Sequence, residues 1–272
     1  MIPLNLMTIL QTLIDPIEGF CLQQYYDGFS HRKTSSAVFK GILIILCYTA
    51  FQYGKKQILP DGHSPWKAAV NLLLTLCFLL FLTACLYRDL GIFRIFPAVS
   101  FVVIQETGRM VTLILPYLTG LPTPILRWRQ SSGHTVSEAD ALFFALLAVN
   151  GMWILIYGFR VLILHVSLSS IRKQFPERPP SIHPAELQYL LLPALIAFCI
   201  HLLLNLILFR SDSRGGELFL FDLYPVLRLF VPILLLLSLV SVLYGVRLYQ
   251  RMVVLRQDQS SRAVLEEQLK SM

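Results

Sequence analysis

Charged side chains are scarce in this sequence. Asp, Glu, Lys and Arg together make up 14% of the 272 residues, whereas a soluble globular chain carries roughly a quarter. Apolar residues make up 56%, and they gather into long runs that a single water-facing core could not absorb. The composition therefore excludes an ordinary soluble domain. It predicts an all-α integral membrane protein that forms one compact helical bundle.

Metal-binding and catalytic patterns are missing as well. The five cysteines all lie in apolar runs, without a C-x-x-C pair or a histidine at ligand spacing, which argues against a disulfide framework or a metal site. No protease or hydrolase signature occurs, and no glycine-rich phosphate loop. We therefore expect no catalytic residue, no cofactor and no metal.

The 23 basic residues exceed the 16 acidic ones, which in a membrane protein reflects topology rather than nucleic-acid binding.

Long apolar runs predict about seven membrane-spanning helices, because a helix needs about 20 residues to cross a hydrocarbon core about 30 Å thick. The runs without any charged residue are Ala68–Tyr87, Ala141–Phe159, Leu187–Phe209 and Leu229–Val246. Three further spans are Leu4–Tyr26, Gly41–Gly54 and Ile95–Gly120. The first of these three contains charged residues and a proline and is the weakest, so six spans are the alternative.

The distribution of basic residues predicts the orientation. With the C-terminus inside, the inner segments hold fourteen basic residues, Arg160 among them, and the outer loops hold seven, including Lys55 and Lys56. Cytoplasmic loops of membrane proteins are enriched in Lys and Arg. We therefore expect a multi-pass membrane protein with its N-terminus outside and its C-terminus in the cytoplasm.

Five polar residues are expected near the middle of the membrane. Glu106 and Arg109 are three residues apart and share one helical face. Asp15 and Glu18 have the same spacing, and Asn150 lies near the centre of another span. Because ionisable groups at this depth usually face the bundle interior, we predict one buried cluster in which Arg109 pairs with a carboxylate and at least one acid is protonated. The cluster either fixes helix packing, acts as a switch or ligand contact, or lines a proton or ion path.

The tail after Val246 is predicted to continue the last helix into the cytoplasm, because it contains no Gly or Pro. Residues 1–246 then form the transmembrane module and residues 247–272 a signalling helix. A partial heptad pattern, interrupted by charge, predicts a weak two-helix seam and a homodimer. The apolar seam residues are Leu248, Leu255, Leu265, Leu269 and Met272. A frayed polar tail is the alternative.

This layout resembles the N-terminal sensor half of bacterial histidine kinases with GHKL-type ATPase domains, of the peptide-sensing, accessory-gene-regulator-like kind. The shared features are short outer loops, an acid in the first span (Asp15 or Glu18), a helix that opens with PAELQYLLL after a basic loop, and a last helix that ends in LEEQLKSM. The resemblance implies a quorum-sensing type of two-component signalling, with a small peptide as ligand.

The kinase part of that family has no counterpart in this sequence, which has no histidine after Val246 and no Asn- and Gly-rich ATP-binding box. The chain is then either a truncated or split sensor half, whose kinase domain or response regulator is supplied elsewhere, or a stand-alone relative without the enzyme. The leading hypothesis is a membrane module that senses or relays a signal. A transporter or permease that uses the buried charges is the alternative, although no internal repeat supports it. A purely structural membrane protein is the third.

Overall fold

The computed structural model describes residues 2–29, 36–58, 65–87, 92–119, 138–175, 184–211, 217–219 and 226–271. These ranges form long helices and one short strand pair, in the order α1 (Ile2–Asp27), α2 (Ser36–Ile58), α3 (Pro65–Leu86), α4 (Ile95–Thr119), α6 (Glu138–Lys173), α7 (Pro184–Leu208), β1 (Phe209–Ser211), β2 (Glu217–Phe219) and α9 (Leu227–Ser271). The strands pair antiparallel, with Phe209 opposite Phe219. The expected all-helical architecture is thus present, with a minor hairpin that the hydropathy pattern did not predict.

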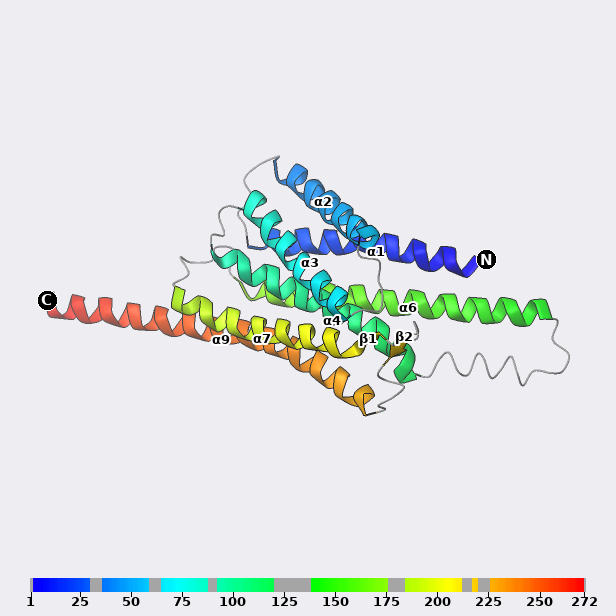
Figure 1. Cartoon of the computed structure of the whole chain (residues 1–272). Coiled ribbons are helices and arrows are strands. Elements are labelled where there is room, and N and C mark those ends of the chain that lie inside the picture. Colours follow the sequence, from blue (N-terminus) through cyan, green and yellow to red (C-terminus); the bar gives the residue numbers. More distant parts are fainter. Residues whose placement is uncertain are drawn as a thin grey trace.

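The helices lie side by side along one direction, and α4 occupies the middle of the bundle (Figure 1). It packs against α1, α3, α6, α7 and α9. As a result, every side chain from Phe96 to Ile104 is buried. This position allows α4 to carry polar side chains at its centre, since its neighbours shield them.

Four of the described helices are long and apolar enough to cross a membrane. The apolar windows lie within Trp66–Leu86, Gly151–Lys173, Leu187–Ile207 and Leu229–Lys270, the last of which also includes the charged tail. Their outward faces carry large apolar side chains, for example Phe81, Leu155 and Leu236, with 67%, 74% and 65% of their surface exposed. A water-facing helix bundle would place polar residues there. The apolar exterior is therefore compatible with a membrane protein.

Helix α6 is longer than the span predicted over Ala141–Phe159. The apolar residues after Arg160, VLILHV, continue the helix to Lys173. The assignment of Arg160 to an inner loop was therefore wrong, because that residue lies inside the helix. The prediction of one continuous last helix is confirmed, since α9 runs unbroken from Leu227 to Ser271.

Aromatic rings join the ends of several helices near the point where α9 leaves the bundle. Phe29 packs edge-on against Tyr25, Phe93 and Phe175, with ring centroids 5.0, 5.5 and 5.1 Å apart. Phe175, just after α6, stacks on Tyr249 of α9 at 5.6 Å. Aromatic pairs of this kind stabilise packing beyond simple burial. They fix α6 to α9 at this end of the bundle.

Candidate functional site: a polar layer across the bundle

A buried ion pair joins α1 to α6. The Arg160 guanidinium lies 2.6 Å from Glu18 Oε1, and its Nε donates a hydrogen bond to the same oxygen at 2.8 Å. The other carboxylate oxygen accepts hydrogen bonds from Gln105 Nε2 at 2.7 Å and from the Tyr48 hydroxyl at 3.2 Å. Glu18 is 1% exposed. Its charge is thus matched by one cation and two neutral donors from three other helices.

A second ion pair lies between α1 and α2, closer to the C-terminal end of α2. Lys56 Nζ is 2.7 Å from Asp15 Oδ2. The adjacent Lys55 Nζ donates a hydrogen bond of 3.0 Å to Thr75 Oγ1 of α3. The two lysines therefore turn inward and connect α2 to both of its neighbours.

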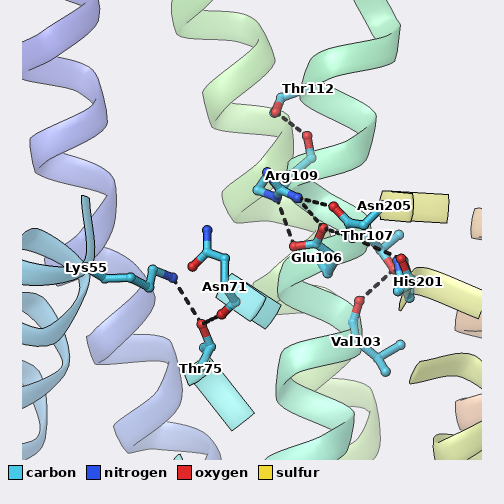
Figure 2. A network of polar contacts seen from close by, with 10 residues as sticks. All are labelled: Lys55, Asn71, Thr75, Val103, Glu106, Thr107, Arg109, Thr112, His201 and Asn205. Atoms are coloured by element: carbon cyan, nitrogen blue, oxygen red, sulfur yellow. Dashed lines mark hydrogen bonds and ion pairs between the residues drawn. The ribbon is translucent and has the colours of Figure 1, made fainter. Parts of the chain in front are cut away.

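The third group lies between α4 and α7 and is drawn in Figure 2. Arg109 donates two hydrogen bonds to Glu106, from Nε to Oε2 at 2.9 Å and from a terminal nitrogen to Oε1 at 2.5 Å. Asn205 of α7 closes the group, because its Oδ1 accepts from Arg109 at 2.7 Å and its Nδ2 donates to Glu106 Oε1 at 2.8 Å. Bidentate contacts of this type hold both charged groups in a fixed orientation.

A histidine extends the layer from α4 to α9. His201 Nε2 of α7 lies 3.0 Å from Thr107 Oγ1 and 3.0 Å from Ser238 Oγ. Both hydroxyls donate their protons to backbone carbonyls, those of Val103 and Leu235, at 2.8 Å. Their oxygens are therefore left to accept, and the arrangement fits a neutral imidazole with its proton on Nε2. His201 is fully buried.

Three consecutive residues of α4 organise the layer. Gln105 contacts Glu18 of α1, Glu106 contacts Asn205 of α7, and Thr107 contacts His201. Successive residues of a helix point about 100° apart. One turn of the central helix can therefore bind several neighbours at one level, which a surrounding helix could not do.

The predicted site residues do not share a single cluster among the described side chains. Glu106 pairs with Arg109, so Arg109 has a carboxylate partner as expected. Asp15 and Glu18 pair instead with Lys56 and Arg160. Each of these carboxylates has its own cation, so charge balance does not require a protonated acid, contrary to the expectation.

Six other predicted residues lie outside these ion pairs. Asn150 is part of α6, but its side chain lies outside the described residues, as does Met272. The seam residues Leu255, Leu265 and Leu269 are exposed on α9, and Leu248 is partly buried.

Several residues of the layer escaped the sequence reasoning, namely Tyr48, Gln105, Arg160 and Asn205. Asn205 lies deep in an uncharged run, so the depth criterion applied to Asn150 would also have found it. Arg160 was missed because the predicted span Ala141–Phe159 ends just before this first charged residue, although the apolar pattern continues beyond it. Tyr48 could not be recognised as part of the layer from the sequence, since tyrosine is frequent at membrane interfaces and does not by itself indicate a buried polar contact.

The layer consists of paired carboxylates and guanidinium groups, amides, hydroxyls and the His201 imidazole, and its contacts join several helices. Among the described residues, no set of three or more His, Cys, Asp or Glu side chains is placed to hold a metal ion. A comparison with protein-family models, with curated proteins and with solved structures found no match to this chain.

Proposed function

We propose that this chain is a multi-pass protein of the bacterial plasma membrane that relays a signal through the bundle to its cytoplasmic tail. In this proposal all seven described helices cross the membrane and the C-terminus is inside. The chain itself catalyses no reaction. Its tail passes the movement to a kinase domain or response regulator, as the resemblance to sensor kinases implies.

The polar layer, whose two sets of hydrogen bonds meet at one turn of α4, is the observation that carries the proposal. Hydrogen bonds run from Glu18 of α1 through Gln105 of α4, and from Thr107 of the same helix turn through His201 to Ser238 of α9. Polar contacts in a low-dielectric interior are costly to leave unmade. A displacement of α1 or α6 therefore imposes a rearrangement on α4 and, through it, on α9.

The shape of α9 supports its role as the output element. Inside the bundle it buries a stripe that includes Val242, Val246 and Tyr249. Beyond the bundle it continues as an isolated helix (Figure 1). Leu255 lies nine residues after Val246, and hence about 180° around the helix. The seam residues thus begin on the face opposite the bundle, where a second copy of the tail can pack.

Cysteine crosslinking of the tail tests the relay. Single cysteines at Leu265 or Leu269 are placed in the full-length chain, with its native cysteines replaced by alanine, and disulfide formation is measured in membranes. We expect dimers at both positions. His201→Leu removes the contact with Ser238. It should change the crosslinking yield about fivefold, which corresponds to a coupling free energy of about 1 kcal/mol between the layer and the tail.

Ser241→Ala is the matched control, because Ser241 Oγ also links α9 to α7, through the Pro193 carbonyl at 3.2 Å, but lies outside the layer. It should leave the crosslinking yield unchanged. An unchanged yield in the His201 variant would reject the relay. If only monomer forms at every protein density, dimerisation through the tail is wrong.

A proton- or ion-coupled transporter is the second candidate, and the buried pairs Glu18–Arg160 and Glu106–Arg109 favour it. Paired charges inside membrane helices often mark proton or substrate paths. Vesicles containing the purified chain and a pH-sensitive dye distinguish the two functions. A relay should not dissipate an imposed pH gradient, whereas a carrier should, and Glu18→Gln should abolish that flux.

A further inference from the structure

The junction of α6 and α9 brings basic side chains together at the end of the bundle from which the tail emerges. Phe175 stacks on Tyr249, and Gln250 Nε2 donates a hydrogen bond to the Gln174 carbonyl. Lys173 immediately precedes this contact on α6 and is exposed. Arg247 and Arg251 flank it on α9 and are also exposed.

The three basic residues lie on the same flank of the junction. Helices α6 and α9 run in the same direction (Figure 1). Just after α6, Phe175 stacks on Tyr249 and the Gln174 carbonyl accepts the hydrogen bond from Gln250. On α9, Arg247 and Arg251 lie about 60° and 100° from Gln250, on the side away from Tyr249. On α6, Lys173 lies about 100° from Gln174, on the side away from Phe175. All three therefore border the flank on which the two glutamines meet.

The surface of α9 next to these residues changes from apolar to basic along one helical face. Val240, Tyr244, Arg247 and Arg251 follow a spacing of four, three and four residues, which keeps them on one face. Val240 and Tyr244 are 49% and 56% exposed. Since the rise is about 1.5 Å per residue, Tyr244 lies about 5 Å along the helix from Arg247, and the whole face from Val240 to Arg251 is about 16 Å long.

Helix α6 repeats this arrangement. Leu162, Val166 and Lys173 are spaced by four and seven residues and share a face, and the two apolar side chains are 54% and 56% exposed. Each of the two helices thus carries an exposed apolar face that ends in cations near the junction. Within the described residues, no carboxylate pairs with Lys173, Arg247 or Arg251.

We infer that Lys173, Arg247 and Arg251 bind the phosphate headgroup of an anionic phospholipid. The cations donate hydrogen bonds to the phosphate oxygens, and the acyl chains lie along Leu162, Val166, Val240 and Tyr244. The adjoining apolar faces favour a lipid over a free phosphate, which would contact only the cations. The inference rests on the membrane insertion proposed above but not on the relay.

Lipid titration of the full-length chain tests the site. Purified protein in neutral detergent is titrated with phosphatidylglycerol or phosphatidylcholine, and bound lipid is counted by native mass spectrometry. The triple variant Lys173→Gln, Arg247→Gln, Arg251→Gln should lower the apparent affinity for phosphatidylglycerol about tenfold or more. The affinity for phosphatidylcholine should stay the same.

The matched control is the triple variant Arg256→Gln, Arg262→Gln, Lys270→Gln, which removes the same charge from the exposed tail farther out. It should keep the affinity for phosphatidylglycerol within about twofold of wild type. Equal losses in the two triple variants, equal binding of the two lipids, or displacement of the lipid by millimolar inorganic phosphate would each overturn the inference. A chain that fails to insert into membranes would instead overturn the proposed function.

Discussion

At the scale of single residues, Glu18–Arg160 is the most deeply buried of the three ion pairs described above. Only 1% of the Glu18 side chain and 14% of the Arg160 side chain are exposed. The mutual attraction of such a pair largely offsets the cost of removing both charges from water. Removing one partner leaves the other without compensation, so single and double substitutions should differ sharply.

Arg160→Leu should destabilise the bundle by about 3–5 kcal/mol, because it leaves the Glu18 carboxylate buried without its cation. Adding Glu18→Gln should recover much of that loss. The free energy of unfolding in mixed detergent micelles measures both effects. Lys67→Gln, at an exposed position of α3, is the control and should change little. A double variant as unstable as the single one would show that the pair is not the stabilising contact.

Arg109 provides the corresponding prediction for the other side of α4. Arg109→Leu removes the cation that holds Glu106 and also the hydrogen bond to Asn205. We expect a loss of a few kcal/mol, since a buried carboxylate loses its compensating charge. Combining it with Glu106→Gln should restore much of the stability, whereas combining it with Glu18→Gln should not. Rescue by Glu18→Gln would place Arg109 in a shared cluster with α1.

At the scale of helices, glycine decides how closely α9 approaches α7. A Cβ at Gly245 would lie 3.0 and 3.1 Å from the Pro193 ring and 3.3 Å from the Tyr189 carbonyl oxygen. Neither the proline ring nor the backbone can move aside easily. Small residues of this kind let membrane helices pack backbone to backbone, and here the close contact holds the output helix against α7.

Gly245→Ala should therefore destabilise the bundle by about 1–3 kcal/mol, the usual cost of an overpacked contact. Gly158→Ala is the matched control, because a Cβ there meets no atom within 4 Å. Alanine favours a helix over glycine by about 1 kcal/mol, so the control should be neutral or stabilising. Thermal unfolding of both variants in detergent measures the difference. Equal stability of the two would mean that α7 and α9 do not approach closely at Gly245.

At the scale of the whole molecule, the exterior is apolar and the interior holds the ion pairs. Helix α4 is shielded by five neighbouring helices, which permits charged residues at its centre. The outer faces, by contrast, present leucine, phenylalanine and isoleucine. This distribution predicts that the bundle inserts into a membrane with α4 out of contact with lipid.

Cysteine labelling in intact cells tests the orientation. Trp66→Cys, at the exposed start of α3, should react with a membrane-impermeant maleimide from outside. Lys270→Cys, on the exposed tail, should react only after the membrane is permeabilised. The reverse pattern would invert the topology. Protease access to an N-terminal tag separates seven spans from six, because only an odd number places the two ends on opposite sides.

The helices and their apolar character followed from the sequence, because both depend on local composition. Long apolar runs with few or no charged residues form membrane helices, even where they contain a proline, such as Pro193 in α7 and Pro232 in α9. The tail after Val246 contains no Gly or Pro and continues α9 because its residues favour a helix. The ion pairs were decided by the tertiary structure. Glu18 meets Arg160 across 142 positions of the chain, and no local pattern indicates which helices become neighbours. Only packing determines that Gln105 of α4 faces Glu18 of α1 whereas Glu106 and Thr107 face Asn205 and His201 of α7, because each of these helices is placed by contacts along its whole length.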